Sequence, residues 1–348
     1  MRIAFVTSTP LAIRQGSGTF VGIATLKTAL ERLGVSVDVI SPQLSLPVLT
    51  ARRLIFNEQL RRRDWRPYDA VVGFDMDGYR IAGRTGKFHI AAPKGVIADE
   101  MRFERGITRA LMRIQAACEQ VHVRRAHQVV ATSRYSAETI RRVYGLSETP
   151  AVVPELIDLT SWREYFAKIE PRPKRRFSLL SVCRFYPRKR LGDLIEAAYL
   201  LREPIPELEV RIVGGGPQER AWRELAQKLG LQRTVTWLGD VDAVSLAREY
   251  VSADLFCLPS AQEGFGIVFL EAMAAGLPVV AARAGAAPEL APPECLAECG
   301  NPASLAEVIL RLYRQPEERA RWREEGLRRV KQFDAPLVAR QFLEALRS

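Results

Sequence analysis

The sequence predicts an α/β protein of two Rossmann-like domains, each built on a parallel sheet. Short apolar runs alternate with helical patterns along most of the chain. The runs are apolar almost throughout, as expected for strands that helices cover on both faces. The chain has 348 residues, which is enough for two domains of roughly 150–180 residues, each with its own core.

The first half starts this alternation at its first residues. Gly34 and Gly145 each follow a helical pattern, at the position where a left-handed residue closes a helix. Parallel order follows because each strand returns through a helix. The predicted strands are 3–7, 35–40, 70–74, 88–92, 128–132 and 151–153, and the predicted helices are 20–33, 50–65, 103–125 and 136–144.

A Pro-rich and basic segment at 171–176 predicts a linker, and the alternation restarts after it. We therefore expect a first domain over 1–170, a second over 171–332, and a last helix within 333–348. In the second domain the predicted strands are 177–183, 209–213, 234–237, 255–258 and 278–282, and the predicted helices are 191–202, 217–229, 245–251 and 267–275.

Composition excludes some classes of protein. No apolar run reaches the ~20 residues that span a bilayer, and the N-terminus lacks the cleavage site of a signal peptide. Five cysteines are an odd number, and three lie in apolar runs, which favours reduced thiols in a cytoplasmic protein. Cys295 and Cys299 have no second pair beside them, so no metal site is expected there.

Charge is unevenly distributed. Residues 1–150 contain 23 Lys and Arg against 13 Asp and Glu, and the remainder contains 28 against 27. A basic domain attracts a phosphorylated lipid, an acidic membrane surface or nucleic acid, although an arginine-rich composition explains the charge equally well. No aromatic-rich basic module is present, so nucleic acid is not expected. The helical pattern around 51–65 carries Arg52, Arg53, Arg61, Arg62 and Arg63 beside apolar residues, which is typical either of a helix on an anionic membrane or of one packed on its own sheet.

The segment from Glu263 to Glu271 is the most informative in the chain. It follows an apolar strand and contains a Gly-x-Gly turn before a helical run. If the helix begins near Ile267, the amides of its first turn lie between the two carboxylates. Such amides and the helix dipole attract phosphate. The pattern predicts a nucleoside diphosphate at the helix start, with one carboxylate for a sugar and one for the ribose.

Two further loops support a diphosphate site. Arg184 and Lys189 follow the first strand of the second half, where fixed cations would stabilise a leaving diphosphate. Gly214 opens the run 214–216 after the next strand, where glycines allow close approach of the backbone to a ligand, and Pro217 suits a first helical position.

These motifs together resemble the retaining glycosyltransferases of the GT-B fold, family 4 type. Glu263 and Glu271 resemble the family's E-x7-E signature, and Arg184 and Lys189 match its basic element in spacing, with Cys183 where the family usually has Gly. The resemblance extends over nearly the whole chain and is strongest over 177–290. It implies two domains that face each other across a cleft, with the C-terminal helix crossing back to the first domain.

The resemblance also implies roles for individual residues. Arg184, Lys189 and Glu263 are the expected catalytic residues, and no metal or other cofactor is expected. No residue is an obvious nucleophile, so a front-face reaction is expected in which the leaving phosphate takes the acceptor's proton. The expected donor-binding residues are Gly16, Ser17, Gly214, Leu238, Gly264, Phe265, Gly266, Ile267, Val268 and Glu271.

The first domain holds the candidate acceptor contacts. Asp75 and Asp77 end a predicted strand as a D-x-D pair, which binds manganese in the other glycosyltransferase fold class but here is interpreted as an acceptor contact or a helix cap. Lys94 stands near the place where the family often has a histidine, and Arg134 follows the strand at 128–132. The three histidines are interpreted as structural.

The expected function is transfer of a sugar from a nucleotide-diphosphate sugar to a saccharide, lipid-linked or other small acceptor, in cell-envelope glycan or glycolipid synthesis. We expect a cytoplasmic enzyme, with peripheral contact to the inner face of the membrane as a further hypothesis. Two alternatives stay open: an epimerase or phosphorylase of the same fold, and a non-catalytic module that binds sugar nucleotides.

Overall fold

The computed structural model describes residues 1–9, 18–43, 48–173 and 176–346. The chain forms two compact units, each with its own parallel sheet. The first unit comprises Met1–Leu156 together with Ala335–Ser348, and the second comprises Ile157–Asp334. The predicted α/β architecture is therefore confirmed, and the C-terminal helix belongs to the first unit.

The described part of the first unit contains a six-stranded parallel sheet in the order β2-β1-β3-β4-β5-β6. Its strands are β1 (Arg2–Val6), β2 (Ser36–Ile40), β3 (Ala70–Phe74), β4 (Phe88–Ala92), β5 (Gln128–Ala131) and β6 (Ala151–Val152). Its helices are α1 (Gly18–Arg32), α2 (Leu49–Leu60), α3 (Ile97–Glu100), α4 (Gly106–Arg125), α5 (Arg134–Tyr144) and α13 (Ala335–Ala345), with the short helix η1 (Met101–Phe103) before α4.

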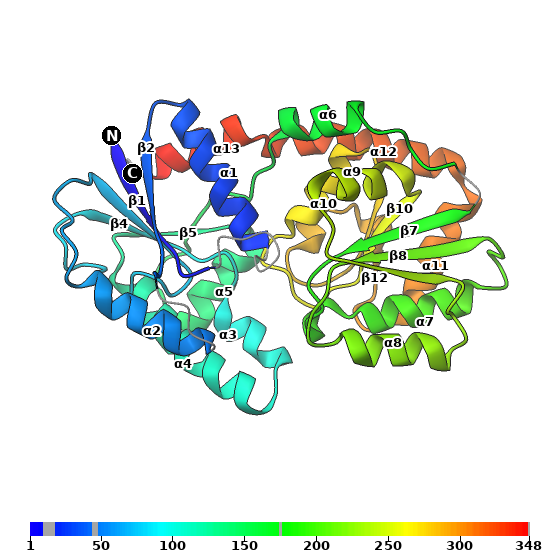
Figure 1. The fold of residues 1–348 in the computed structure, drawn as a ribbon, viewed down its shortest axis with the longest axis horizontal. Helices are drawn as coiled ribbons and strands as arrows, with labels where there is room; N and C mark the ends of the chain where they lie inside the picture. Colours follow the sequence, from blue (N-terminus) through cyan, green and yellow to red (C-terminus); the bar gives the residue numbers. More distant parts are fainter. Residues whose placement is uncertain (10–17, 44–47, 174–175, 347–348) are drawn as a thin grey trace. The chain divides into compact units, whose positions relative to one another are not determined.

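Alternate residues of these strands enter two separate cores, one on each face of the sheet. Ile3 and Phe5 pack with α1 and with α13, so helices from the two ends of the chain lie side by side on one face (Figure 1). Ala4 and Val6 point the other way, into a core that includes Phe56 of α2. Both faces of the sheet are thus covered by helices.

The second unit repeats this plan around the order β12-β11-β10-β7-β8-β9. Its helices surround a single large core, with α7 packed beside α8 and α11, and α10 packed beside α6 and α12 (Figure 1). The strands are β7 (Phe177–Val182), β8 (Leu208–Val213), β9 (Val235–Gly239), β10 (Leu255–Leu258), β11 (Val279–Ala282) and β12 (Leu296–Ala297). The helices are α6 (Leu159–Ala167), α7 (Leu191–Leu201), α8 (Glu219–Lys228), α9 (Ala243–Ser252), α10 (Ile267–Ala274), α11 (Pro302–Arg314) and α12 (Pro316–Arg329), with the short helices η2 (Pro187–Lys189) and η5 (Val330–Phe333).

The division between the units differs from the predicted linker. It falls after Leu156, before α6, and the Pro-rich segment lies inside the second unit. Trp162 of α6 explains the difference, because its ring packs on Tyr250 of α9 and ties α6 to the second core. On the same side of the division, Arg172 donates to Glu249 at 3.0 Å.

Among the described helices, none combines the length and the apolar character needed to cross a membrane.

Candidate functional site

The carboxyl edge of the second sheet gathers the loops that follow three neighbouring strands. β10, β7 and β8 lie side by side, and the loops after them run over 259–266, 183–190 and 214–217. Ligands of open parallel sheets bind at this edge. Most of the predicted donor-binding residues lie on these loops or at the start of α10.

An ion pair joins two of the predicted catalytic residues. Lys189 Nζ donates to Glu263 Oε1 at 2.5 Å, and the Ser260 hydroxyl donates to the same oxygen at 2.7 Å. The side chains of the pair are 12% and 8% exposed. The Ala261 amide donates to the Arg188 carbonyl at 2.8 Å, so the two loops that carry the pair are also joined through their backbones.

The two glutamates lie in buried sites of opposite electrostatics. Burial acts to raise the pKa of Glu263, but the charges of Lys189 and Arg188 outweigh it, and the pKa lies below its ordinary value. Burial raises the pKa of Glu271 to about 7, and the Tyr250 hydroxyl, 2.8 Å from Oε2, offsets only part of that rise. At neutral pH Glu263 is an ionised hydrogen-bond acceptor, whereas Glu271 titrates near neutrality.

Arg184 occupies a more exposed place on the same loop. Its Nη1 lies 3.1 Å from Oδ1 of Asp240, and the two side chains are 34% and 48% exposed. An ion pair this exposed contributes little free energy, so a phosphate could take the guanidinium from Asp240 at small cost. Arg184 and Lys189 therefore have different carboxylate partners in this structure.

Gly266 sets the start of α10, as the sequence predicts. Its φ is +97°, and a Cβ there would meet the Phe269 ring at 2.6 Å, so only glycine fits without strain. The amides of Ile267 and Val268 follow in the first helical turn, where a helix supplies no carbonyl partner. The Phe265 side chain is buried in the core, so this residue can offer a ligand only its backbone.

The Gly-rich turn after β8 packs closely against the loop that follows β7. Gly214 has a φ of +115°, and a Cβ there would lie 2.0 Å from the Cys183 carbonyl oxygen. Gly216 is crowded in the same way by Phe185. These glycines make room for the loop that carries Arg184. Leu238, one of the expected donor-binding residues, is half-buried in β9 next to that turn.

Asp77 is bonded through both carboxylate oxygens inside the first unit, in contrast to its prediction as an acceptor contact. It is fully buried. Its Oδ2 accepts from the Ser8 amide and the Ser8 hydroxyl, both at 2.6 Å, and its Oδ1 accepts from Asn57 Nδ2 at 2.9 Å. The carboxyl group thus ties the end of β1 to α2.

Asp75 has a structural role as well. It is buried, with the left-handed φ of +52° that non-glycine residues rarely adopt. Its Oδ1 accepts from the Lys94 amide at 2.9 Å, and its Oδ2 lies 3.6 Å from Arg53. Its carbonyl oxygen lies 2.7 Å from Nδ1 of His122. The D-x-D pair joins elements of the first unit instead of presenting two oxygens to one ligand.

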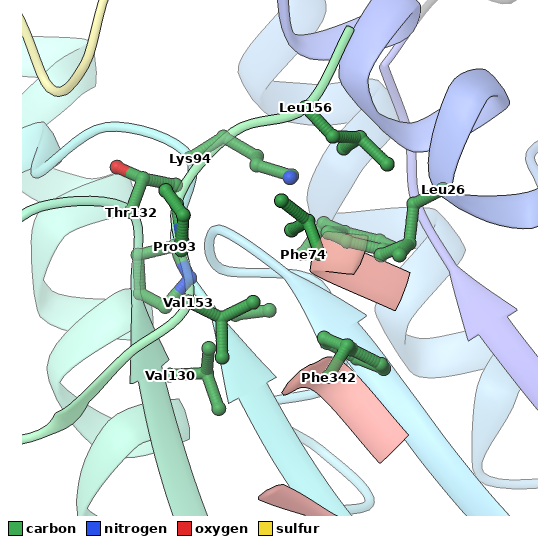
Figure 2. A pocket seen from close by; sticks show the side chains of 12 residues that line it. Leu26, Phe74, Pro93, Lys94, Val130, Thr132, Val153, Leu156 and Phe342 are labelled. Atoms are coloured by element: carbon green, nitrogen blue, oxygen red, sulfur yellow. The ribbon is translucent and has the colours of Figure 1, made fainter. Parts of the chain in front are cut away.

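Lys94 is paired inside the first unit. Its Nζ lies 3.0 Å from Glu155, and both side chains are less than a tenth exposed. Figure 2 shows the lysine extending over a small cavity beside Phe74 and Leu156. The cavity measures about 20 Å³ to the centre of a water-sized sphere, room for roughly one water molecule. It is too small for a saccharide acceptor.

The remaining predicted residues divide between exposed and undescribed positions. Arg134 is exposed at the first residue of α5. Gly16 and Ser17 lie outside the described residues. His89 and His122 are buried, with their Nε2 atoms 2.9 Å apart, in keeping with a structural role.

Sequence reasoning missed three residues that contact the predicted ones, and a fourth, Gln262, that contacts their neighbour Arg188. Tyr250 and Ser260 hold the two glutamates, and Asp240 holds Arg184. Gln262 accepts from Arg188 Nε at 3.0 Å through its Oε1. A carboxylate placed in an apolar helix, as Glu271 is, is a signal that a buried partner exists, but the sequence does not say which residue it is.

Part of this chain matches a known protein family. Residues 163–329, within the second unit of the chain, match the family described as Glycosyl transferases group 1. The chain is similar to a GDP-mannose-dependent alpha-(1-6)-phosphatidylinositol monomannoside mannosyltransferase of Mycolicibacterium smegmatis, 34% identical over 47% of this chain and 46% of that protein. It is also similar to an MMP alpha-(1->4)-mannosyltransferase of Mycolicibacterium hassiacum, 33% identical over 63% and 53%.

The fold matches solved structures over the full chain. Sucrose-phosphate synthase from Thermosynechococcus elongatus aligns with a TM-score of 0.84 at 22% identity, over 99% of this chain and 98% of that one. HepE of Anabaena, solved with UDP and glucose, aligns with a TM-score of 0.75 at 22% identity, over 100% and 99%. The fold is therefore of GT-B type. In sequence, the chain spans about half the length of the first relatives named above.

Proposed function

We propose that this protein is a retaining hexosyltransferase that moves a sugar from a nucleotide-diphosphate sugar to a saccharide or lipid-linked acceptor. The observation that carries the proposal is the Lys189–Glu263 ion pair beside the start of α10, at the carboxyl edge of the sheet. The match of residues 163–329 to the family described as Glycosyl transferases group 1 supports it. Because several relatives are named as GDP-mannose-dependent, GDP-mannose is the first donor to test.

Each charged residue of the candidate site has a proposed role. The Lys189 ammonium has three donors and spends one on Glu263, so it can also bind a phosphate oxygen. The Arg184 guanidinium releases Asp240 and binds the other phosphate. Glu263, held ionised, accepts from hydroxyls of the sugar, and Glu271 accepts from the ribose. The cations act most strongly when the diphosphate leaves, because its charge is greatest then.

The proposed reaction breaks the bond between the anomeric carbon and the phosphate oxygen and forms a bond from that carbon to the acceptor oxygen. The acceptor proton passes to the leaving phosphate. In the site as described, Glu263 is bonded to Lys189 and Glu271 to Tyr250, which supports a reaction without an enzymic nucleophile. The expected products are a nucleoside diphosphate and a glycoside of retained configuration.

A donor and acceptor screen tests the proposal. Purified protein would be incubated with GDP-mannose or UDP-glucose and a panel of saccharide and lipid-linked acceptors, with release of nucleoside diphosphate measured and the anomeric configuration of the product read by NMR. Release that depends on an acceptor, with retention, would support the proposal. An isomerised sugar nucleotide would indicate an epimerase, a requirement for inorganic phosphate a phosphorylase, and binding without turnover a binding module.

Transfer is expected to need no divalent metal, because Lys189 and Arg184 supply the positive charge that a metal would bring to the diphosphate. Activity should stay within about twofold after treatment with EDTA, a change too small to reflect loss of one charge-stabilising group. The measurement is the initial rate before and after chelation, with added MnCl₂ as the comparison. Loss of activity that manganese restores would contradict this expectation.

For contact with a membrane, the surface near α4 is a better candidate than helix α2. Arg52 and Arg53 of the predicted basic helix turn inward, donating to Ser8 and Gln115. The exposed residues around α4 mix positive charge with apolar side chains, and Ile107 is 77% exposed. We propose that this surface rests on an anionic membrane, on the cytoplasmic side. The free thiols of the chain support a reducing compartment. The exposed residues of the surface are Arg105, Ile107, Arg109, Arg113 and Ile114.

Binding to vesicles tests this surface. Wild-type protein should bind phosphatidylglycerol vesicles and release as salt rises from 0.05 to roughly 0.5 M, because salt screens exposed charges. Ile107→Glu should weaken binding roughly tenfold, whereas Val244→Glu, on an exposed site of the second unit, should not. Equal binding to neutral phosphatidylcholine vesicles, or equal loss in both variants, would contradict the proposal.

A further inference from the structure

Tyr250 and Glu271 form a buried hydrogen bond at the base of the proposed donor site. Tyr250 lies on α9 and is fully buried, and Glu271 on α10 is 7% exposed. The phenol hydroxyl lies 2.8 Å from Oε2 of the carboxyl group. Among the described residues no hydrogen bond reaches Oε1, so that oxygen remains available as an acceptor.

Packing fixes the phenol in this position. The Tyr250 ring lies edge-on to Trp162 of α6 at 5.7 Å and tilted against Phe256 of β10 at 6.0 Å. Rings held on two sides leave the hydroxyl little freedom to turn elsewhere. The hydroxyl in turn fixes the direction of the carboxyl group that it meets.

Burying this pair is less favourable in free energy than burying apolar side chains in the same space. A buried carboxyl group costs free energy unless its partners compensate, and here one phenol is the recorded partner of Glu271 in the described part of the chain. Two apolar side chains would pack in that space at lower cost. The arrangement makes physical sense when the second oxygen of Glu271 meets a ligand.

We propose that Tyr250 is a positioning residue of the donor site, holding Oε2 of Glu271 so that Oε1 accepts from a ribose hydroxyl of the nucleoside diphosphate. This inference rests on the proposed function. Tyr250 does not touch the ligand and acts through Glu271.

The charge of Glu271 makes the pair sensitive to pH. Its pKa is about 7, raised by burial and lowered in part by Tyr250. A ribose hydroxyl donates best to the ionised carboxylate, so affinity should fall as pH drops below about 7. Charged groups on the elements packed against α10 are either exposed or paired elsewhere. They are Arg163 and Glu164 on α6, Arg248 and Glu249 on α9, Lys331 on η5, Glu263 on the preceding loop, and, on α12, Glu317, Glu318, Arg319, Arg321, Arg323, Glu324, Glu325, Arg328 and Arg329.

Calorimetry with matched ligands tests the inference. GDP, or UDP if the donor screen selects it, would be compared with its 2′,3′-dideoxy analogue between pH 5.5 and 8.5. Tyr250→Phe should weaken the parent nucleotide roughly tenfold at pH 7.5, the effect of one lost hydrogen bond to a charged group. It should leave the dideoxy analogue within about twofold, because that ligand has no ribose hydroxyl for Glu271.

Removal of the phenol should also move the pH profile. Tyr250 lowers the pKa of Glu271, so in Tyr250→Phe the loss of affinity should begin at a higher pH than in the wild type. Glu271→Gln should abolish this pH dependence. A general loss of packing would not shift a titration midpoint, so this readout separates positioning from structure.

Tyr313→Phe is the matched control. Tyr313 donates to Glu207 at 2.6 Å in the same unit, but Glu207 precedes β8, at the edge opposite the site. The control variant should bind both nucleotides like the wild type. If Tyr250→Phe does not fold, 3-fluorotyrosine at position 250 keeps the shape and makes the phenol a stronger donor. The affinity profile should then move to lower pH.

The possible outcomes are distinct. Equal weakening of both ligands by Tyr250→Phe, or an unmoved pH profile in either Tyr250 variant, overturns the inference and leaves the proposed function intact. If the wild type binds neither GDP nor UDP, the proposed function fails and the inference fails with it.

Discussion

Replacing Lys189 with alanine is expected to lower kcat/KM for the nucleotide-sugar donor by about 10²–10³. The ammonium group lies at the carboxyl edge of the sheet, 2.5 Å from Glu263, and is 12% exposed. In such a sheltered place a positive charge acts strongly on a leaving diphosphate. The loss should appear in kcat as well as in KM, because the interaction is greatest when the diphosphate departs.

The same substitution should lower the stability of the second unit, with a dependence on pH that identifies the cause. Burial alone raises the pKa of Glu263, and Lys189 is the first of the charges that reverse this. Without Lys189 the carboxylate is buried with less compensation at neutral pH, a cost of about 3 kcal/mol. Protonation relieves that cost, so the variant should recover relative to the wild type as pH falls.

Two variants control this experiment. Lys228→Ala removes an exposed lysine of α8 in the same unit and should change neither activity nor stability by more than about 0.5 kcal/mol. Lys189→Ala combined with Glu263→Gln should recover stability but not activity. Steady-state kinetics and urea unfolding at pH 5.5 and 8 provide the measurements. A Lys189→Ala enzyme of normal kcat/KM would remove this residue from the proposed site.

Much of the candidate donor site could be predicted from the sequence because several of its residues are close neighbours along the chain. Glu263, Gly266 and Glu271 lie within nine residues, and the start of α10 falls where Gly266 and the helical run place it. The contact between Lys189 and Glu263 spans 74 positions. From the sequence, both residues could be assigned to one site, but their direct contact could not be predicted. Strand order in the sheet decides which loops meet.

Residues that hold the functional groups in position were not predicted either, because they are distant in sequence from the groups that they contact. Tyr250 lies 21 positions from Glu271, in a helix pattern that looks like ordinary core. The division between the units was obscured because 171–176 has the composition of a linker. Composition does not record that Trp162 packs on Tyr250 and draws α6 into the second unit.

The D-x-D pair is a motif that can be recognised in the sequence, but the residues that surround it in the fold decide its role. A carboxylate at the end of a strand often faces a ligand. Here Ser8 follows the neighbouring strand β1, and Asn57 lies on the helix that covers the sheet. Both supply donors to Asp77, so the carboxyl group is occupied before any ligand arrives.

Replacing Asp77 with alanine is therefore expected to destabilise the first unit by about 3 kcal/mol or more, because three donors lose their acceptor in a buried place. The loss should be local. Hydrogen exchange followed by mass spectrometry should show faster exchange in peptides from β1, β3 and α2, with little change in β7 and β8.

Asp64→Ala is the matched control, because it removes a carboxylate of the same unit that is 51% exposed and paired with Arg66 at the surface. An exposed pair of this kind contributes little to stability, so this variant should unfold at nearly the same urea concentration as the wild type. If Asp77 instead bound a metal needed for transfer, Asp77→Ala would lose activity at unchanged stability, and manganese would protect the wild type from unfolding. The hydrogen bonds from Ser8 and Asn57 favour the opposite pattern: lost stability in the first unit, with the wild type unfolding at the same urea concentration with and without manganese.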